Sequence, residues 1–170
     1  MNMRAVASVL RIGLFAGTLD IGENLIFNAF RHITPTMVLQ YIASGLTGGW
    51  AFHAGLASVA LGIAIHYAIA LVWTAVYWHA SRRVPVLIRR PVVSGMVYGG
   101  AVYAIMNWVV LPLTRVPRSP AAMSIASRIS GVLALLFCIG VTIAVLVQRE
   151  MLRRVPASTI PIRSGAARPA

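Results

Sequence analysis

The stretch AFHAGLASVALGIAIHYAIALVWTAVYW, residues 51–78, decides the fold class, because it contains no Asp, Glu, Lys or Arg from end to end. A transmembrane helix needs about 20 predominantly apolar residues, since the hydrocarbon core of a bilayer is about 30 Å thick. Trp50 lies at one end, and Trp73, Tyr77 and Trp78 lie near the other, as expected of aromatic anchors at the two membrane interfaces. We therefore predict a membrane-spanning helix here.

Three further apolar runs are long enough to span a bilayer. The first covers about residues 5–30, the third about 92–111 and the fourth about 123–147. Lipid offers no hydrogen bonds to the backbone, so spanning segments must be helices or closed barrels. The sequence predicts an all-α, polytopic membrane protein with four transmembrane helices in a bundle, forming one domain over residues 1–154. Residues 155–170 lack apolar periodicity and are predicted to be a disordered cytoplasmic tail.

A fifth, shorter helix is predicted over about residues 35–47. Thr34 is a good N-cap and Pro35 suits the first helical position. A helix of this length cannot cross about 30 Å of hydrocarbon. We expect it to lie in the interface or to enter the membrane and return.

The charge balance argues for lipid as the solvent. The chain is 59% hydrophobic and 11% charged, whereas soluble domains carry about 25% charged residues. Its net charge of +12 comes from arginines in segments that flank the apolar runs, and no basic helix face with interleaved aromatic residues lies outside the spans. We therefore expect a lipid bilayer as the partner and no nucleic acid.

The arginines also predict an orientation, because cytoplasmic loops carry the excess of basic residues. Both termini and the 81–91 turn lie on the side of the membrane that has more arginines, so we expect them to be cytoplasmic. Within this turn, Arg82, Arg83, Arg89 and Arg90 are predicted to contact anionic lipid headgroups. The richer side comprises Arg4, Arg11, Arg82, Arg83, Arg89, Arg90, Arg149, Arg153, Arg154, Arg163 and Arg168, and the poorer side Arg31, Arg115, Arg118 and Arg128.

Glycines four residues apart predict where helices approach each other closely. Gly13 and Gly17 form one GxxxG pattern in the first span, and Gly95 and Gly99 form another in the third. Small residues let backbones meet where lipid provides no hydrophobic drive for association. Gly131 is predicted to do the same in the fourth span. The repeated pattern suits a duplicated two-helix hairpin or chance, and the seams also allow a homo-oligomer.

Ionisable groups inside the spans need a partner or a purpose, because each costs about 2.5–3.5 kcal/mol at a helix centre. We predict that Asp20 or Glu23 pairs with Arg128 across the bundle. Such a group either fixes the helix register or forms a polar path or ligand site in the outer half of the bundle. The candidate network comprises Asp20, Glu23, Asn24, Asn28, Asn107 and Arg128.

Two histidines of the second span, His53 and His66, are further candidate polar or ligand residues. A spacing of 13 residues, repeated to His79, turns a helical side chain by about 220°, so successive histidines leave different faces. The other spans contain no histidine, so haem ligation would require a homodimer. No zinc, phosphate-loop or nucleophile motif occurs, and we expect no cofactor and no metal.

Three stretches carry a family resemblance: GLFAGTLD (residues 13–20), the helix that bears His66 and continues through residues 77–83, and GMVYGGAVYAIMNWVVLPLTRVP (residues 95–117). Together they resemble small bacterial inner-membrane proteins of the YagU-like kind. The resemblance implies a bacterial inner membrane and supplies no catalytic residue.

Three hypotheses for the function follow. The first is a non-enzymatic accessory or structural component, for which the core should be closed and packed. The second is a small transporter or channel subunit, for which a cavity should reach the polar network. The third is a haem-binding membrane protein.

Overall fold

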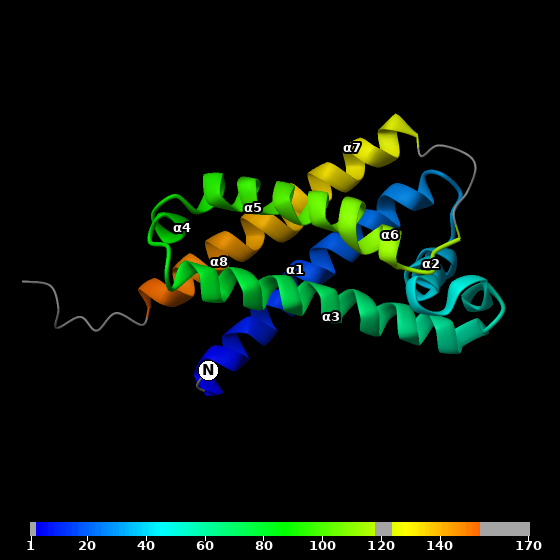
Figure 1. Ribbon diagram of the computed structural model, residues 1–170, viewed down its shortest axis with the longest axis horizontal. Coiled ribbons are helices and arrows are strands. Elements are labelled where there is room, and N and C mark those ends of the chain that lie inside the picture. The colour runs from blue at the N-terminus through cyan, green and yellow to red at the C-terminus, as the bar shows by residue number, and fades with distance from the viewer. Residues whose placement is uncertain (1–2, 118–123, 154–170) are drawn as a thin grey trace, which may run out of the picture.

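The computed structural model describes residues 3–117 and 124–153, and in these ranges the chain is helical without strands (Figure 1). Four of its helices are long and apolar enough to cross a membrane. The predicted all-α, four-helix class is therefore confirmed. The predicted tail over residues 155–170, Met123 at the start of the fourth predicted span, and Arg118 and Arg154 lie outside the described residues.

The four spans follow one another with short connections. The first span is α1 and the second is α3, whereas the third and fourth are each built from three consecutive helical segments. Their bounds are Met3–Ala29 for α1, Gly55–Ser81 for α3, Pro91–Ile105 for α5 with Met106–Val110 for η2 and Leu111–Leu113 for α6, and Ile125–Leu133 for α7 with Ala134–Val141 for η3 and Thr142–Leu152 for α8.

The second span begins a few residues later than the sequence predicts. Residues Gly48–Phe52 form a short 3₁₀ helix, η1, and α3 starts only at Gly55. Gly48 has a φ of 65° and a ψ of −149°, a conformation open to glycine and costly for other residues. This turn redirects the chain before the second span, so His53 lies in the connection and not within α3.

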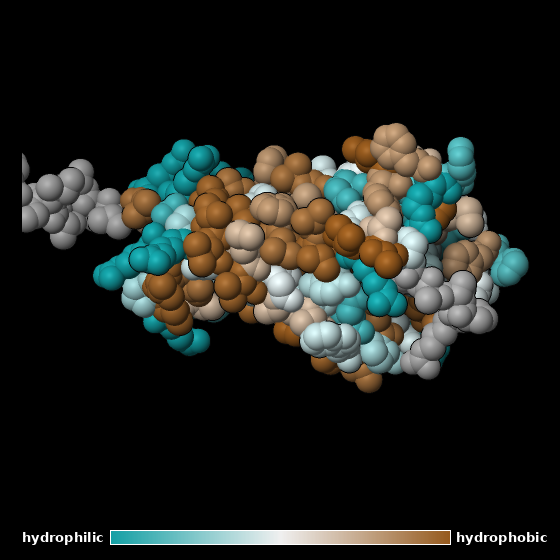
Figure 2. All heavy atoms as spheres, turned by 90° about the horizontal axis from the view of Figure 1, so that it is seen from above, coloured by the Kyte–Doolittle hydropathy of each residue, from teal (hydrophilic) through white to brown (hydrophobic). Residues whose placement is uncertain are grey.

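The outer surface of the bundle suits a bilayer. Figure 2 shows hydrophobic side chains across the middle of the visible face, with hydrophilic side chains toward the ends. Large apolar side chains such as Val72, Val97 and Trp108 are exposed on the spans, Trp108 by 79%. Single exposed apolar residues are ordinary on soluble proteins, but faces of this extent are not. Four long apolar helices with such faces are typical of a multi-pass membrane protein.

The bundle has two distinct ends, which we call the termini end and the α2 end. Met3 and Arg153 lie at the termini end, where Ser8 Oγ donates a hydrogen bond of 2.8 Å to Glu150 Oε1 and joins the first span to the last. Helix α4, Val86–Arg89, connects α3 to α5 at the same end.

Glycines hold the helices together in two pairs. Helix α1 packs on α3 through Gly13 and Gly17, where an added Cβ would come within 3.0 Å of the Ala70 Cβ at Gly17. Helix α5 packs on the fourth span, where an added Cβ at Gly95 would come within 2.7 Å of the Val141 Cα. Gly95 and Gly99 therefore lie where two backbones nearly touch, whereas Gly13 and Gly17 make room for side chains of α3.

The half of the bundle next to the termini end, which we call the packed half, has a dense core. Tyr77, Trp78, Ile143 and Val147 are 0%, 2%, 0% and 0% exposed. Tyr98, at the edge of this half, donates a hydrogen bond of 2.6 Å to the Trp73 carbonyl oxygen and joins α5 to α3. The core cluster comprises Ala5, Val9, Ile12, Ala16, Tyr77, Trp78, Ile139, Ile143, Ala144 and Val147.

Helix α2, Pro35–Thr47, has the bounds predicted for the short helix. The Thr34 side chain caps it by accepting a hydrogen bond of 3.3 Å from the Met37 amide, as the sequence indicates. The helix packs on α3, where Gly62 lies against the Leu39 backbone. It therefore covers the end of the bundle opposite the termini (Figure 1).

Candidate functional site

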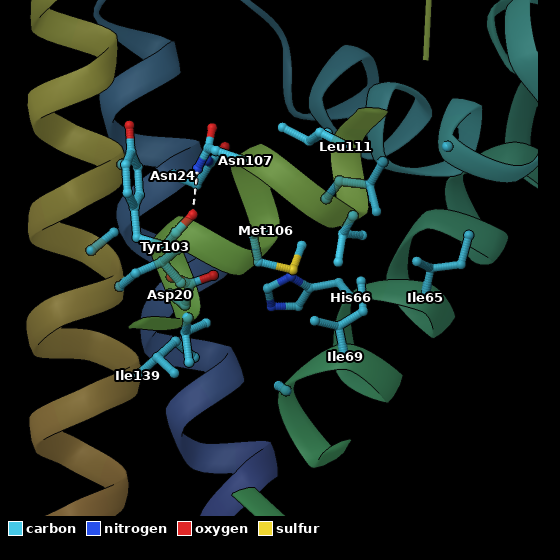
Figure 3. Close-up of a pocket in the computed structure, with 18 of the residues that line it drawn as sticks. Asp20, Asn24, Ile65, His66, Ile69, Tyr103, Met106, Asn107, Leu111 and Ile139 are labelled. Atoms are coloured by element: carbon cyan, nitrogen blue, oxygen red, sulfur yellow. Dashed lines mark hydrogen bonds between the residues drawn. The ribbon is translucent and has the colours of Figure 1, made fainter. Parts of the chain in front are cut away.

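The half of the bundle next to the α2 end, which we call the hollow half, contains a partly open cavity of about 500 Å³ (Figure 3). All four spans and α2 contribute to its walls. Small-molecule sites in proteins typically have volumes of about 300–1,000 Å³ and apolar walls with a few polar groups. The cavity matches this description in size and in composition, because most of its lining side chains are apolar.

Polar side chains from different spans converge on this cavity. Asp20 and Asn24 come from α1, and His66 comes from α3. The other two are Asn107, from η2, and Arg128, from α7. The structure thus brings four residues of the predicted polar network to one space from three separate helices, and His66 joins them from a fourth.

His66 is positioned by a hydrogen bond to the first span. Its Nε2 lies 2.8 Å from the Gly17 carbonyl oxygen, and because a carbonyl only accepts, Nε2 is the donor. In a neutral imidazole the other nitrogen, Nδ1, is then an acceptor. The Tyr67 ring meets the His66 ring edge-on with 5.3 Å between centroids. These two contacts fix the imidazole at the cavity wall.

Asp20 projects toward His66, as Figure 3 shows. The carboxylate is partly buried, and it forms no hydrogen bond or ion pair with another described residue. The two asparagines, in contrast, bond locally: Asn107 Nδ2 donates to the Tyr103 carbonyl oxygen at 2.9 Å, and Asn28 Nδ2 donates to Asn24 Oδ1 at 3.0 Å. The acid is therefore the cavity group that most lacks a partner.

The predicted ion pair between Arg128 and an acid of the first span is wrong. An ion pair of 4.0 Å joins Arg11 to Glu150, and none joins Arg128 to Asp20 or Glu23 within the described part of the chain. Glu23 instead accepts a hydrogen bond of 2.6 Å from Ser130 Oγ. This contact sets the register of α1 against α7 and leaves Arg128 closer to the α2 end than either acid.

The remaining predicted residues lie elsewhere. Asn28 bonds to Asn24 but does not line the cavity, and His53 is exposed in the connection before α3. Gly131 lines the cavity, but an added Cβ there would make only an ordinary contact, 3.7 Å from the Tyr103 ring. Arg82, Arg83, Arg89 and Arg90 are all exposed at the termini end.

Sequence reasoning missed the seam of Gly140 and several aromatic residues of the cavity. An added Cβ at Gly140 would come within 2.8 Å of the Gly99 amide nitrogen. Gly140 and the buried Ala144 are four apart, a small-residue spacing that could have indicated this contact. Tyr103 and Trp73 also line the cavity, and nothing in their sequence context indicates it.

Both π-helical segments found in residues 3–117 and 124–153 lie against the cavity. Met106 and Asn107 of η2 line it, as do Leu135 and Ile139 of η3. The π-helix is rare and occurs frequently at functional sites, since it shifts side chains out of the ordinary helical register. Here the two segments bring residues of the third and fourth spans to the same cavity wall.

In comparisons with protein-family models, curated proteins and solved structures, no match to this chain was found. The YagU-like resemblance therefore stays a prediction, and the geometry of the cavity carries the functional argument.

Proposed function

We propose that this protein binds a small molecule within the membrane, as a small transporter or carrier subunit, and that the cavity in the hollow half is its binding site. One observation carries the proposal: a cavity of about 500 Å³ has three ionisable residues, Asp20, His66 and Arg128, in its lining. Ionisable residues within transmembrane segments are rare, and they commonly mark substrate or ion pathways.

The contrast with the packed half supports this proposal over a purely structural role. A register-fixing network would place its polar groups against one another in a filled core. The Ser8–Glu150 contact does so at the termini end. Asp20 and Arg128 instead face a shared space, which leaves room for a ligand to complete their interactions.

We further propose a bacterial inner membrane as the location, with the termini end in the cytoplasm. The exposed arginines support this orientation, because they are concentrated at that end and few lie at the α2 end. A reporter that is active only in the cytoplasm should be active when it is fused after residue 153, and a reporter that is active only outside the cytoplasm should be inactive there. The opposite pattern of activity would show that the termini lie outside the cytoplasm.

The binding proposal is tested by the thermal stability of the purified protein in detergent, measured against a panel of amines, amino acids, carboxylic acids and lipids. A molecule that binds the folded state raises the unfolding temperature. We expect at least one class to do so, and we expect Asp20→Asn to abolish the shift.

Glu23→Gln is the matched control. It removes a negative charge from the same helix one turn away, but Glu23 bonds to Ser130 and does not line the cavity. The shift should survive in this variant. A panel in which nothing stabilises the protein, or a shift that persists in Asp20→Asn, would contradict the proposal.

A further inference from the structure

Two opposite charges face the cavity without meeting. Asp20 and Arg128 both line it, and neither forms a hydrogen bond or an ion pair with another described residue. The donor of the neighbouring His66 is directed at Gly17 instead. Leaving a buried charge uncompensated is costly, and this applies to the carboxylate above all, since Arg128 is largely exposed.

The register of the helices explains why the two charges do not pair. Ser130 of α7 lies opposite Glu23 of α1, at 2.6 Å. Asp20 is three residues from Glu23 toward the termini end, and Arg128 is two residues from Ser130 toward the α2 end. At 1.5 Å of rise per residue, the two Cα atoms are about 7.5 Å apart along the bundle. One molecule in the cavity can bridge this offset.

The cavity lining as a whole contains groups that suit both ends of such a molecule. The aromatic rings of Trp73 and Tyr103 line the cavity together with Asp20, and aromatic faces attract organic cations. The side chains of Asn24 and Asn107 line it together with Arg128 and supply amide groups that can donate to an acid. The remaining walls are apolar.

We infer that the ligand is a zwitterionic amphiphile, whose ammonium group binds Asp20, whose phosphate or carboxylate binds Arg128, and whose apolar body lies against the cavity walls. This inference rests on the proposed binding function. A zwitterion compensates both protein charges at once, whereas a simple anion or cation would leave one of them unpaired. An aminophospholipid headgroup and a free apolar amino acid both have this chemistry.

The test uses the full chain in gentle detergent and four probes. Native mass spectrometry measures the bound fraction of phosphatidylethanolamine, of phosphatidylglycerol, which has the acid alone, and of a dialkyl dimethylammonium lipid, which has the cation alone. Calorimetric titration measures the binding of free leucine. We expect one of the two zwitterions to bind more tightly than both single-charge lipids.

Variants of Asp20 and Arg128 show which residue binds the ammonium group of the ligand and which binds its acidic group. Asp20→Asn and Arg128→Gln should each weaken binding of the zwitterion by about tenfold or more, because each leaves a ligand charge unpaired. Glu23→Gln and Arg115→Gln are the matched controls, since Arg115 is an exposed arginine near α2 that does not line the cavity. Should Asp20→Asn fail to give a monodisperse protein, Asp20→Glu keeps the charge and should retain binding.

Each outcome separates the inference from the proposed function. Phosphatidylethanolamine binding that needs both Asp20 and Arg128 supports a lipid ligand, and leucine binding with the same dependence supports a free solute. If phosphatidylglycerol binds best and depends on Arg128 alone, or if the cationic lipid binds best and depends on Asp20 alone, the zwitterion is wrong while the binding site stands. If none of the four probes binds, and no compound of the panel raises the unfolding temperature, both proposals fail.

Discussion

The packed half and the hollow half are built from the same four spans, yet they enclose different things. Near the termini, large side chains such as Tyr77, Trp78 and Ile143 fill the space between the helices. Beyond Trp73, toward α2, the same helices surround a cavity of about 500 Å³. The difference indicates that the packed half provides most of the stability. This stability allows the hollow half to keep an open cavity with charged groups in its lining.

The first prediction compares two adjacent glycines of α5, and it has the largest expected effect. An added Cβ at Gly99 would come within 2.6 Å of the Leu136 Cα, whereas one at Gly100 would meet nothing within 4 Å. Gly99→Val should destabilise the protein by more than about 3 kcal/mol, because the backbones of two spans would have to separate. Gly100→Val should be neutral or slightly stabilising, since valine favours a helix more than glycine does. Unfolding in a denaturing detergent measures both, and equal losses would mean that α5 does not pack as described.

The second prediction applies one truncation to both halves. Ile143 is 0% exposed in the packed core, and Ile69 lines the cavity. Ile143→Ala should cost about 2 kcal/mol of the free energy of unfolding, because it leaves a void, and Ile69→Ala should cost below about 1 kcal/mol, because it enlarges a space that already exists. The same unfolding assay measures both variants. Equal costs would erase the distinction between the halves.

The third prediction removes one hydroxyl from each half. Tyr98 donates to the Trp73 carbonyl oxygen at 2.6 Å, whereas no hydrogen bond of the Tyr103 hydroxyl occurs among the described residues. Tyr98→Phe should lose about 1 kcal/mol, the typical net contribution of a hydrogen bond, and Tyr103→Phe should change stability little. If Tyr103→Phe proves the more destabilising, the cavity contains a contact that the structure does not show.

The overall architecture could be predicted from the sequence more completely than the candidate site. Long apolar runs and the Thr34–Pro35 helix start depend on local chemistry, so the four spans and the bounds of α2 could be predicted. The register between spans depends on contacts between distant residues. The predicted pairing of Arg128 with an acid of the first span is wrong because nothing local indicates that Ser130 lies opposite Glu23.

The cavity was the least predictable feature. Hydropathy places Asp20 and Asn107 inside the membrane, but it does not say whether the space between them is filled. That depends on the π-helical segments η2 and η3 and on the sizes of side chains from several helices. The close packing of Gly13, Gly17, Gly95 and Gly99, in contrast, had a local signal, the four-residue spacing.

Two tryptophans of α3 allow the most direct test of the difference between the halves. Trp73 lines the cavity, and Trp78 is 2% exposed in the packed core. In variants that retain one of these two tryptophans and replace the others by phenylalanine, quenching of the fluorescence by acrylamide reports access for a small molecule. We predict a several-fold larger quenching constant for Trp73 than for Trp78. Equal protection of the two indoles would show that the hollow half is closed and would contradict a binding site there.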